Sequence, residues 1–158
     1  MKLNFTKPMH AALAVALLAA SAALWGCAQA GSVPVGGGNP PPAAALMDLC
    51  NNTANGCSTG NSFSLNVARD INIKVSWINV APGTHTQTMQ IIEPGGGLYE
   101  AKTQAFAIAD GSAGSVNTEE IFPVAGTWIT ERQRTGEWTI QISLDDQLYT
   151  TQKVQLTP

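Results

Sequence analysis

The chain has 158 residues, of which only 12% are charged, and its formal net charge at pH 7 is −3. From Cys27 onward, six Lys and Arg stand against eleven Asp and Glu that are scattered along the chain. This dispersed, mildly acidic charge excludes the clustered basic surface that nucleic acids need, and equally a basic face for anionic lipid. The length predicts one domain with appended segments.

The N-terminus predicts export from the cytoplasm. Lys2 and Lys7 precede an uncharged run rich in Ala, Leu and Val, which extends from Ala11 to Trp25. That run is shorter than the roughly 20 residues of a typical membrane span. A positive start followed by a short apolar stretch is typical of a secretory signal peptide, which we assign to residues 1–26 and exclude from the fold.

Two cleavage sites follow the apolar run. Leu24, Gly26 and Cys27 resemble the lipobox of bacterial lipoproteins, and this resemblance implies cleavage before Cys27 and attachment of lipid to that cysteine. We therefore expect an outer-membrane lipoprotein, facing the periplasm or the cell surface and held in the membrane by its N-terminal lipid. The alternative site is the A-x-A pattern at residues 28–30, which would give a soluble periplasmic or secreted protein.

We expect residues 27–60 to form a lipidated or linker segment. Residues 31–45 are rich in Gly and Pro without periodicity, which is typical of a flexible tether, and residues 43–49 could add one helical turn. Cys50 and Cys57 remain as an even pair in an oxidising compartment, so we expect a disulfide that closes a short loop. Their C-x6-C spacing does not favour a redox or metal site.

Residues 61–158 show the period-two alternation of half-buried strands, with turn signals every 8–12 residues or so. No segment has a convincing helical period. The pattern predicts about seven or eight strands and therefore an antiparallel β-sandwich, with a barrel as the alternative. The extended runs that we expect are 63–67, 71–77, 84–92, 98–108, 115–124, a short run at 126–130, and a closing hairpin at 136–156.

The closing hairpin has the clearest pattern of all. Its first run alternates apolar Trp138, Ile140, Ile142 and Leu144 with polar residues, and the two aspartates 145–146 then break the run. Burial should stabilise the fold by roughly 1.5–3 kcal/mol for each of these four side chains. The second run is expected to place Leu148, Val154 and Leu156 on one face and Tyr149 on the other.

Three segments resemble exported bacterial domains of immunoglobulin-like fold: 77–85 (WINVAPGTH), 94–99 (PGGGLY) and 136–146 (GEWTIQISLDD). Such domains often close with a G-x-W strand, an acidic turn and a last strand. The resemblance covers most of residues 63–158 and implies a fold, but it implies no activity. Cys50 and Cys57 are too close in sequence to bridge two sheets as antibody cysteines do, so Trp77 and Trp138 are expected to fill the core.

The sequence offers little catalytic chemistry. His85 is the one histidine after the signal peptide, and no G-x-S-x-G motif accompanies it. We expect His85 to be a partly exposed strand residue and Asp145 and Asp146 to be ordinary turn residues, although a hydrolase using His85 stays an open, less favoured alternative. We expect no enzyme activity, no catalytic residue, no cofactor and no metal site.

Tyr99, Trp128 and Tyr149 are the aromatic residues that could bind a ligand, because Trp77 and Trp138 share the parity of the core residues. We expect a non-enzymatic module of the cell envelope that serves protein interaction or envelope architecture, with an unknown protein partner. An exposed edge strand could recruit that partner by β-addition. The alternative is a carbohydrate-binding module, in which the three aromatic residues contact a glycan.

Overall fold

The computed structural model describes residues 41–53 and 56–158. The signal peptide, Cys27 and most of the expected tether lie outside these residues. Within them the chain forms nine strands and one four-residue helix. The elements are β1 (Ala44–Thr53), β2 (Gly56–Thr59), β3 (Ser62–Ser64), β4 (Asp70–Val80), β5 (Gly83–Ile92), β6 (Leu98–Ile108), β7 (Gly114–Pro123), α1 (Trp128–Glu131), β8 (Gly136–Leu144) and β9 (Gln147–Thr157).

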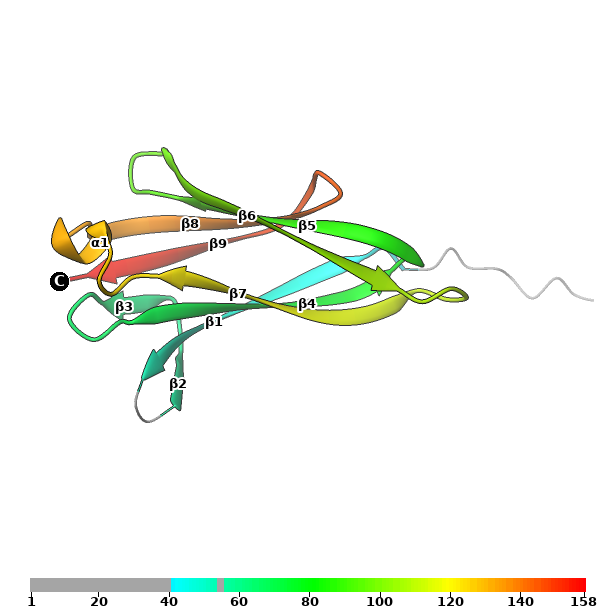
Figure 1. Ribbon diagram of the computed structural model, residues 1–158, viewed down its shortest axis with the longest axis horizontal. Helices are drawn as coiled ribbons and strands as arrows, with labels where there is room; N and C mark the ends of the chain where they lie inside the picture. The colour runs from blue at the N-terminus through cyan, green and yellow to red at the C-terminus, as the bar shows by residue number, and fades with distance from the viewer. Residues whose placement is uncertain (1–40, 54–55) are drawn as a thin grey trace, which may run out of the picture. The chain divides into compact units, whose positions relative to one another are not determined.

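The strands form two sheets that face one another as the layers of a sandwich (Figure 1). One sheet has the order β2-β1-β4-β7, and the other has the order β3-β9-β8-β5-β6. Every pairing is antiparallel except that of β3 with β9, which is parallel. The predicted all-β sandwich is therefore confirmed.

Alternation along the central strands builds one core between the sheets. From Ile71 to Trp77 in β4 and from Trp138 to Leu144 in β8 every second side chain is buried, as expected for strands with one dry face. Trp77 from one sheet and Trp138 from the other are both fully buried, which confirms them as core residues. The core continues with Ile71, Ile73, Val75, Met89, Ile91, Phe122, Ile140, Ile142, Val154 and Leu156.

The closing hairpin forms as β8 and β9, with Asp145 and Asp146 as its two turn residues. Both have positive φ, 48° and 66°, which is the geometry of a type I′ turn and matches the twist of the flanking strands. A register shift between Ile142 and Ser143 changes the parity expected for β9. Leu148 therefore pairs with Ser143 and is 53% exposed, so its predicted place in the core is wrong.

The segment before residue 61 differs most from expectation. Residues 44–53 form β1, which pairs with β4 over most of its length, so the expected helical turn at 43–49 is wrong. Alternate residues of β1 face the core and Leu49 is buried there, and this packing outweighs the weak helix preference of the Ala-rich start. The sandwich thus includes β1 and β2 and begins before residue 61.

The disulfide between Cys50 and Cys57 is confirmed. It joins β1 to β2, and the two Cα atoms are 5.5 Å apart, a normal separation for such a bridge. Since β2 is short and all four of its residues are exposed, the covalent link fixes an edge strand that buries little surface.

Two short runs that were expected to extend as strands do not. Residues 128–131 form α1 instead, because the Thr127 hydroxyl accepts a hydrogen bond from the Ile129 N–H and caps the helix. After β3 the chain turns, and the N–H groups of Val67 and Ala68 both donate to the Ser64 carbonyl. Val67 is consequently exposed rather than part of a strand.

Candidate functional site

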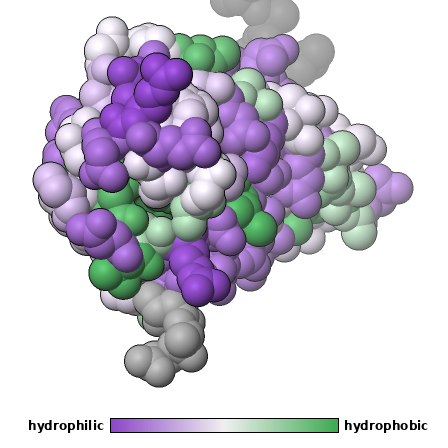
Figure 2. Space-filling model, turned by 60° about the vertical axis from the view of Figure 1, so that its left-hand side comes forward, coloured by the Kyte–Doolittle hydropathy of each residue, from purple (hydrophilic) through white to green (hydrophobic). Residues whose placement is uncertain are grey.

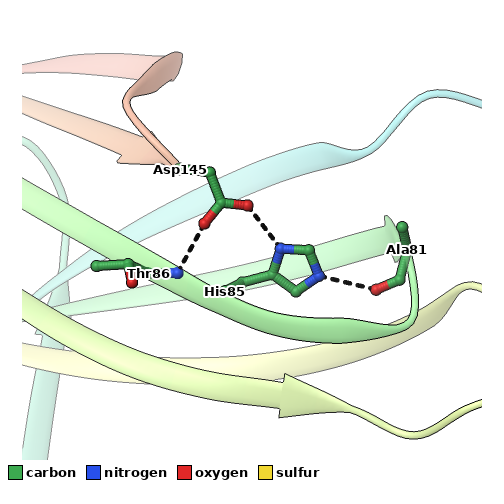
Figure 3. Close-up of polar contacts among 4 residues, drawn as sticks. All are labelled: Ala81, His85, Thr86 and Asp145. Carbon is green, nitrogen blue, oxygen red and sulfur yellow. Dashed lines mark hydrogen bonds and ion pairs between the residues drawn. The ribbon is translucent and has the colours of Figure 1, made fainter.

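His85 lies in a closed set of hydrogen bonds rather than in an open catalytic arrangement (Figure 3). Its Nδ1 is 2.7 Å from Asp145 Oδ2, and its Nε2 is 2.9 Å from the Ala81 carbonyl oxygen. The other oxygen of Asp145 accepts from the Thr86 N–H at 2.8 Å. These contacts connect the β4–β5 turn, β5 and the β8–β9 turn at one end of the sandwich.

The electrostatics of this pair favour the charged forms of both groups. Hydrogen bonds to Asp145 and to the Ala81 carbonyl raise the pKa of His85 above 6.5, and hydrogen bonds from Thr86 and His85 lower the pKa of Asp145. Both ring nitrogens are hydrogen-bonded within the chain, to Asp145 and to the Ala81 carbonyl. The arrangement holds two turns together.

Aromatic rings gather at the other end of the sandwich, beside α1. Tyr99 on β6 lies 5.5 Å from the Trp128 ring and 5.4 Å from the Trp138 ring, measured between ring centroids, and Phe122 also contacts Trp138. Tyr99 is half-buried, and burial raises the pKa of its hydroxyl. Trp128 is 37% exposed and presents the outermost ring of the group.

Tyr149 does not join Tyr99 and Trp128. It lies near the β8–β9 turn, is half-buried, and packs edge-on against Trp77 with a centroid distance of 5.2 Å. The prediction that Tyr149 faces outward is wrong, because the register shift in the closing hairpin turns its side chain toward the core. Of the three candidate aromatic residues, the structure brings two together.

An open recess of about 370 Å³ lies beside α1 and is lined by Trp128, Arg132 and Arg134. The Arg134 guanidinium forms an ion pair with Glu93 and lies 4.8 Å above the Trp128 ring centroid. Figure 2 brings the α1 end of the sandwich forward and shows strongly hydrophilic residues over its upper part, with hydrophobic residues below them. Arg132 and Arg134 were not predicted as site residues, although both lie within six residues of Trp128 in the sequence.

The edges of the sheets differ in length and protection. Strands β2 and β3 are edges of only four and three residues, whereas β7 and β6 have ten and eleven. Lys102 on β6 reaches across to β7 and donates to the Ile121 carbonyl at 2.5 Å, which occupies an acceptor on β7. Among the described strands, β6 is thus a long edge with no such contact on its outer side, and β1 and β9 also extend well beyond their short edge partners β2 and β3.

The outward side chains of β6 are small and uncharged. Ala101, Thr103, Ala105 and Ala107 share the outward parity and are exposed. The charged residues of the strand, Glu100 and Lys102, have the opposite parity and are only half-exposed. An incoming strand would therefore meet small, uncharged side chains on the outer face of the sheet, and Glu100 and Lys102 on the inner face.

Among the described residues, no group of three or more His, Cys, Asp or Glu is arranged to hold a metal ion. No helix in this part of the chain is long and apolar enough to cross a membrane. The disulfide engages Cys50 and Cys57, so neither thiol is available as a ligand or nucleophile.

The strand order defines the class of the domain. β1, β4 and β7 occupy the places of strands A, B and E, and β5, β8 and β9 those of C, F and G, in the two sheets of an immunoglobulin-like sandwich. The chain is therefore an immunoglobulin-like β-sandwich module, as the sequence resemblance implied.

Comparisons with known proteins agree at the level of fold. The alkylpurine DNA glycosylase AlkC of Pseudomonas fluorescens superposes with a TM-score of 0.51 and 14% identity over 73% of this chain, which spans only 30% of the glycosylase. An immunoglobulin-like protein of Pseudomonas aeruginosa gives 0.49 and 8% identity, covering 76% of this chain and all of that protein. The C-terminal domain of wzt gives 0.48 and 10%, covering 73% and 74%. No protein-family model and no curated protein sequence matches the chain.

Proposed function

We propose that this chain is a non-enzymatic, exported module of the cell envelope that binds a protein partner by strand addition to β6. The observation that carries the proposal is the contrast between the edges: β7 has a lysine from β6 on its backbone, while β6 is eleven residues long, pairs regularly with β5 from Glu100 to Ile108 and has small outward side chains. Backbone groups on such an edge pair with an extended segment of another chain.

The side chains next to this edge limit the kind of partner. Thr103 pairs with Thr88 on the neighbouring strand, and Ala105 pairs with Thr86, so the outward surface continues as small, neutral residues onto β5. Cross-strand neighbours contribute most when they are β-branched or aromatic. We therefore expect an extended partner segment with uncharged, β-branched residues at alternate positions.

Export is supported by the signal-like N-terminus and by the disulfide, because disulfides persist in oxidising compartments. We propose in addition that Cys27 carries lipid and anchors the module to the outer membrane. Metabolic labelling with palmitate, in wild type and in the Cys27→Ala variant, tests this directly. Label in wild type alone supports the anchor, and an unlabelled wild-type protein refutes it.

The strand-addition proposal is tested by photo-crosslinking in cells that produce the full chain. A photoreactive residue at position 105 should give a discrete adduct, because its side chain would lie beside the outward side chains of the incoming strand. The substitution Thr103→Lys should abolish the adduct, since it adds a charge on the outer face of the edge, where wild-type β6 has only small neutral side chains. The matched control is Gln141→Lys, which places the same charge on the same face of β8, away from any edge.

The outcomes separate cleanly. An adduct at position 105 that survives Gln141→Lys and is lost in Thr103→Lys supports strand addition. An adduct that both lysines remove equally indicates binding to the sheet face instead and contradicts the proposal, as does the absence of any adduct at position 105.

A further inference from the structure

The recess lined by Trp128, Arg132 and Arg134 is held rigidly by the core beneath it. Ile129 of α1 is fully buried, and its carbonyl accepts the Arg134 N–H at 2.8 Å. The indole N–H of Trp138 donates to the Arg134 carbonyl at 3.3 Å. Because the backbone on both sides of the recess is fixed in this way, the side chains that line it are positioned before any ligand arrives.

The Arg134 guanidinium is oriented on two sides. The Glu93 carboxylate pairs with it, and the Trp128 ring lies beneath it at 4.8 Å. A planar guanidinium held in this way keeps a fixed set of N–H donors, which is the geometry that matches carboxylate oxygens. Since the Glu93 carboxylate balances the charge of Arg134, this arginine adds oriented N–H donors to the recess but no net positive charge.

Arg132 supplies the unbalanced charge. It is exposed, it lines the same recess, and it takes part in none of the four ion pairs found among the described residues. Glu131 precedes it in sequence but also makes no ion pair within that part of the chain. An uncompensated arginine in a recess is notable in a chain whose formal net charge is −3.

The size and wall of the recess indicate what it holds. A volume of about 370 Å³ lies in the range of about 300–1,000 Å³ typical of small-molecule sites, and it exceeds what a simple inorganic anion fills. Trp128 contributes a partly exposed aromatic surface, backed by Tyr99. Arg134 covers one face of the indole, so a ligand that suits this site packs against the part of the indole that stays exposed and has an anionic group for the two arginines.

We propose that this recess is a binding site for an acidic sugar residue, whose carboxylate is bound by Arg132 and Arg134 and whose ring packs against the exposed part of Trp128 that Arg134 does not cover. The site is at the α1 end of the sandwich and is separate from the outward face of β6 at Ala101, Thr103 and Ala105. The proposed sugar site can therefore be tested independently of strand addition to β6.

The test uses the full chain and oligogalacturonate as the probe, with the same oligosaccharide reduced to neutral galactose units as the reference ligand. Calorimetry should show binding of the acidic form that weakens as salt is added, and the neutral form should bind at least tenfold more weakly. Arg132→Gln should weaken the acidic ligand at least tenfold, equivalent to about 1.4 kcal/mol. The matched control is Lys74→Gln, an exposed cation on the outer face of β4, which should change nothing.

Trp128→Leu gives a second measurement and should weaken the acidic ligand without changing its dependence on salt. Thermal unfolding of each variant establishes that the fold is retained. Equal affinity for the acidic and neutral oligosaccharides overturns the proposal, and so does an Arg132→Gln variant that binds like wild type. Failure of the folded wild-type chain to bind oligogalacturonate at about 10 mM, weaker than any useful site on the affinity scale, also overturns it.

Discussion

Gln87 provides the sharpest test of how the two sheets are held together. It is a fully buried polar residue on β5, and its side-chain oxygen accepts hydrogen bonds from Trp77 Nε1 at 2.7 Å and from Thr118 Oγ1 at 2.6 Å. Trp77 belongs to β4 and Thr118 to β7, both in the opposite sheet. One amide oxygen therefore joins three strands through the centre of the core.

The substitution Gln87→Leu removes this acceptor and leaves two buried donors without a partner, at about 1–3 kcal/mol for each. Two gains offset part of that cost. Leucine adds about 1.5–3 kcal/mol of apolar burial, and the buried Gln87 Nε2, which has no hydrogen-bond partner in the described structure, is removed as well. These costs and gains are of similar size, so we expect Gln87→Leu alone to shift the free energy of unfolding by no more than about 1–2 kcal/mol, and the coupling between positions 87 and 118 to carry the information.

A double-mutant cycle identifies the cause. Thr118→Val alone should cost about 0.5–1.5 kcal/mol, the value of one net hydrogen bond. In the double variant the Thr118 hydroxyl is no longer stranded, so the combined loss should be smaller than the sum of the two single losses by about 1 kcal/mol.

Urea unfolding followed by tryptophan fluorescence measures these free energies, and an unchanged m-value indicates that the unfolded reference is the same in all variants. Gln90→Leu, on the outward face of the same strand, is the control and should stay within about 0.5 kcal/mol of wild type. Additive effects of the two substitutions would refute the role assigned to the amide oxygen.

Four further outcomes follow from the structure. Because the pKa of His85 is raised on folding, its contribution to stability should be complete below about pH 6.5 and lost as the pH rises through the folded value; His85→Gln should flatten that part of the stability–pH curve. The lowered pKa of Asp145 acts in the opposite sense, so Asp145→Asn should reduce the loss of stability in acid. Replacing Cys50 and Cys57 by Ser, or adding reductant, should lower the free energy of unfolding by about 2–3 kcal/mol in chemical denaturation. Ile140→Ala should cost about 2–5 kcal/mol in the same assay, because the side chain is fully buried between the sheets.

The sequence predicted the fold best where alternation is strict. The apolar residues of β4 and β8 face the core as expected, since period two alone determines which face of a strand is dry. The prediction from alternation is wrong where the register of two paired strands shifts by one residue. The register shift after Ile142 places Leu148 on the outer face and Tyr149 toward the core. The prediction also missed β1, whose start is rich in alanine and takes its structure from pairing with β4.

The candidate sites depend on contacts that no local pattern contains. Arg134 meets Glu93 across 41 positions of sequence, and Asp145 meets His85 across 60. Trp128 could be selected as an aromatic residue outside the core alternation, but its two neighbouring arginines become a site only because the β5–β6 hairpin brings Glu93 and Tyr99 beside α1. The difference between the two long edges likewise arises from one lysine that crosses from one sheet to the other.

The directions of the first and last strands determine how this domain would respond to mechanical force. Ala44 begins β1 opposite Ile78, whereas Thr157 ends β9 beside Ser64, near the start of β4, so the two ends of the described chain leave from opposite ends of the sandwich (Figure 1). Tension between them acts along the strands and loads the hydrogen bonds of β1 with β4 in shear, all at once, rather than opening them one after another as in a zipper. Since forced unfolding is governed by the unfolding rate, such a domain should extend only at high load.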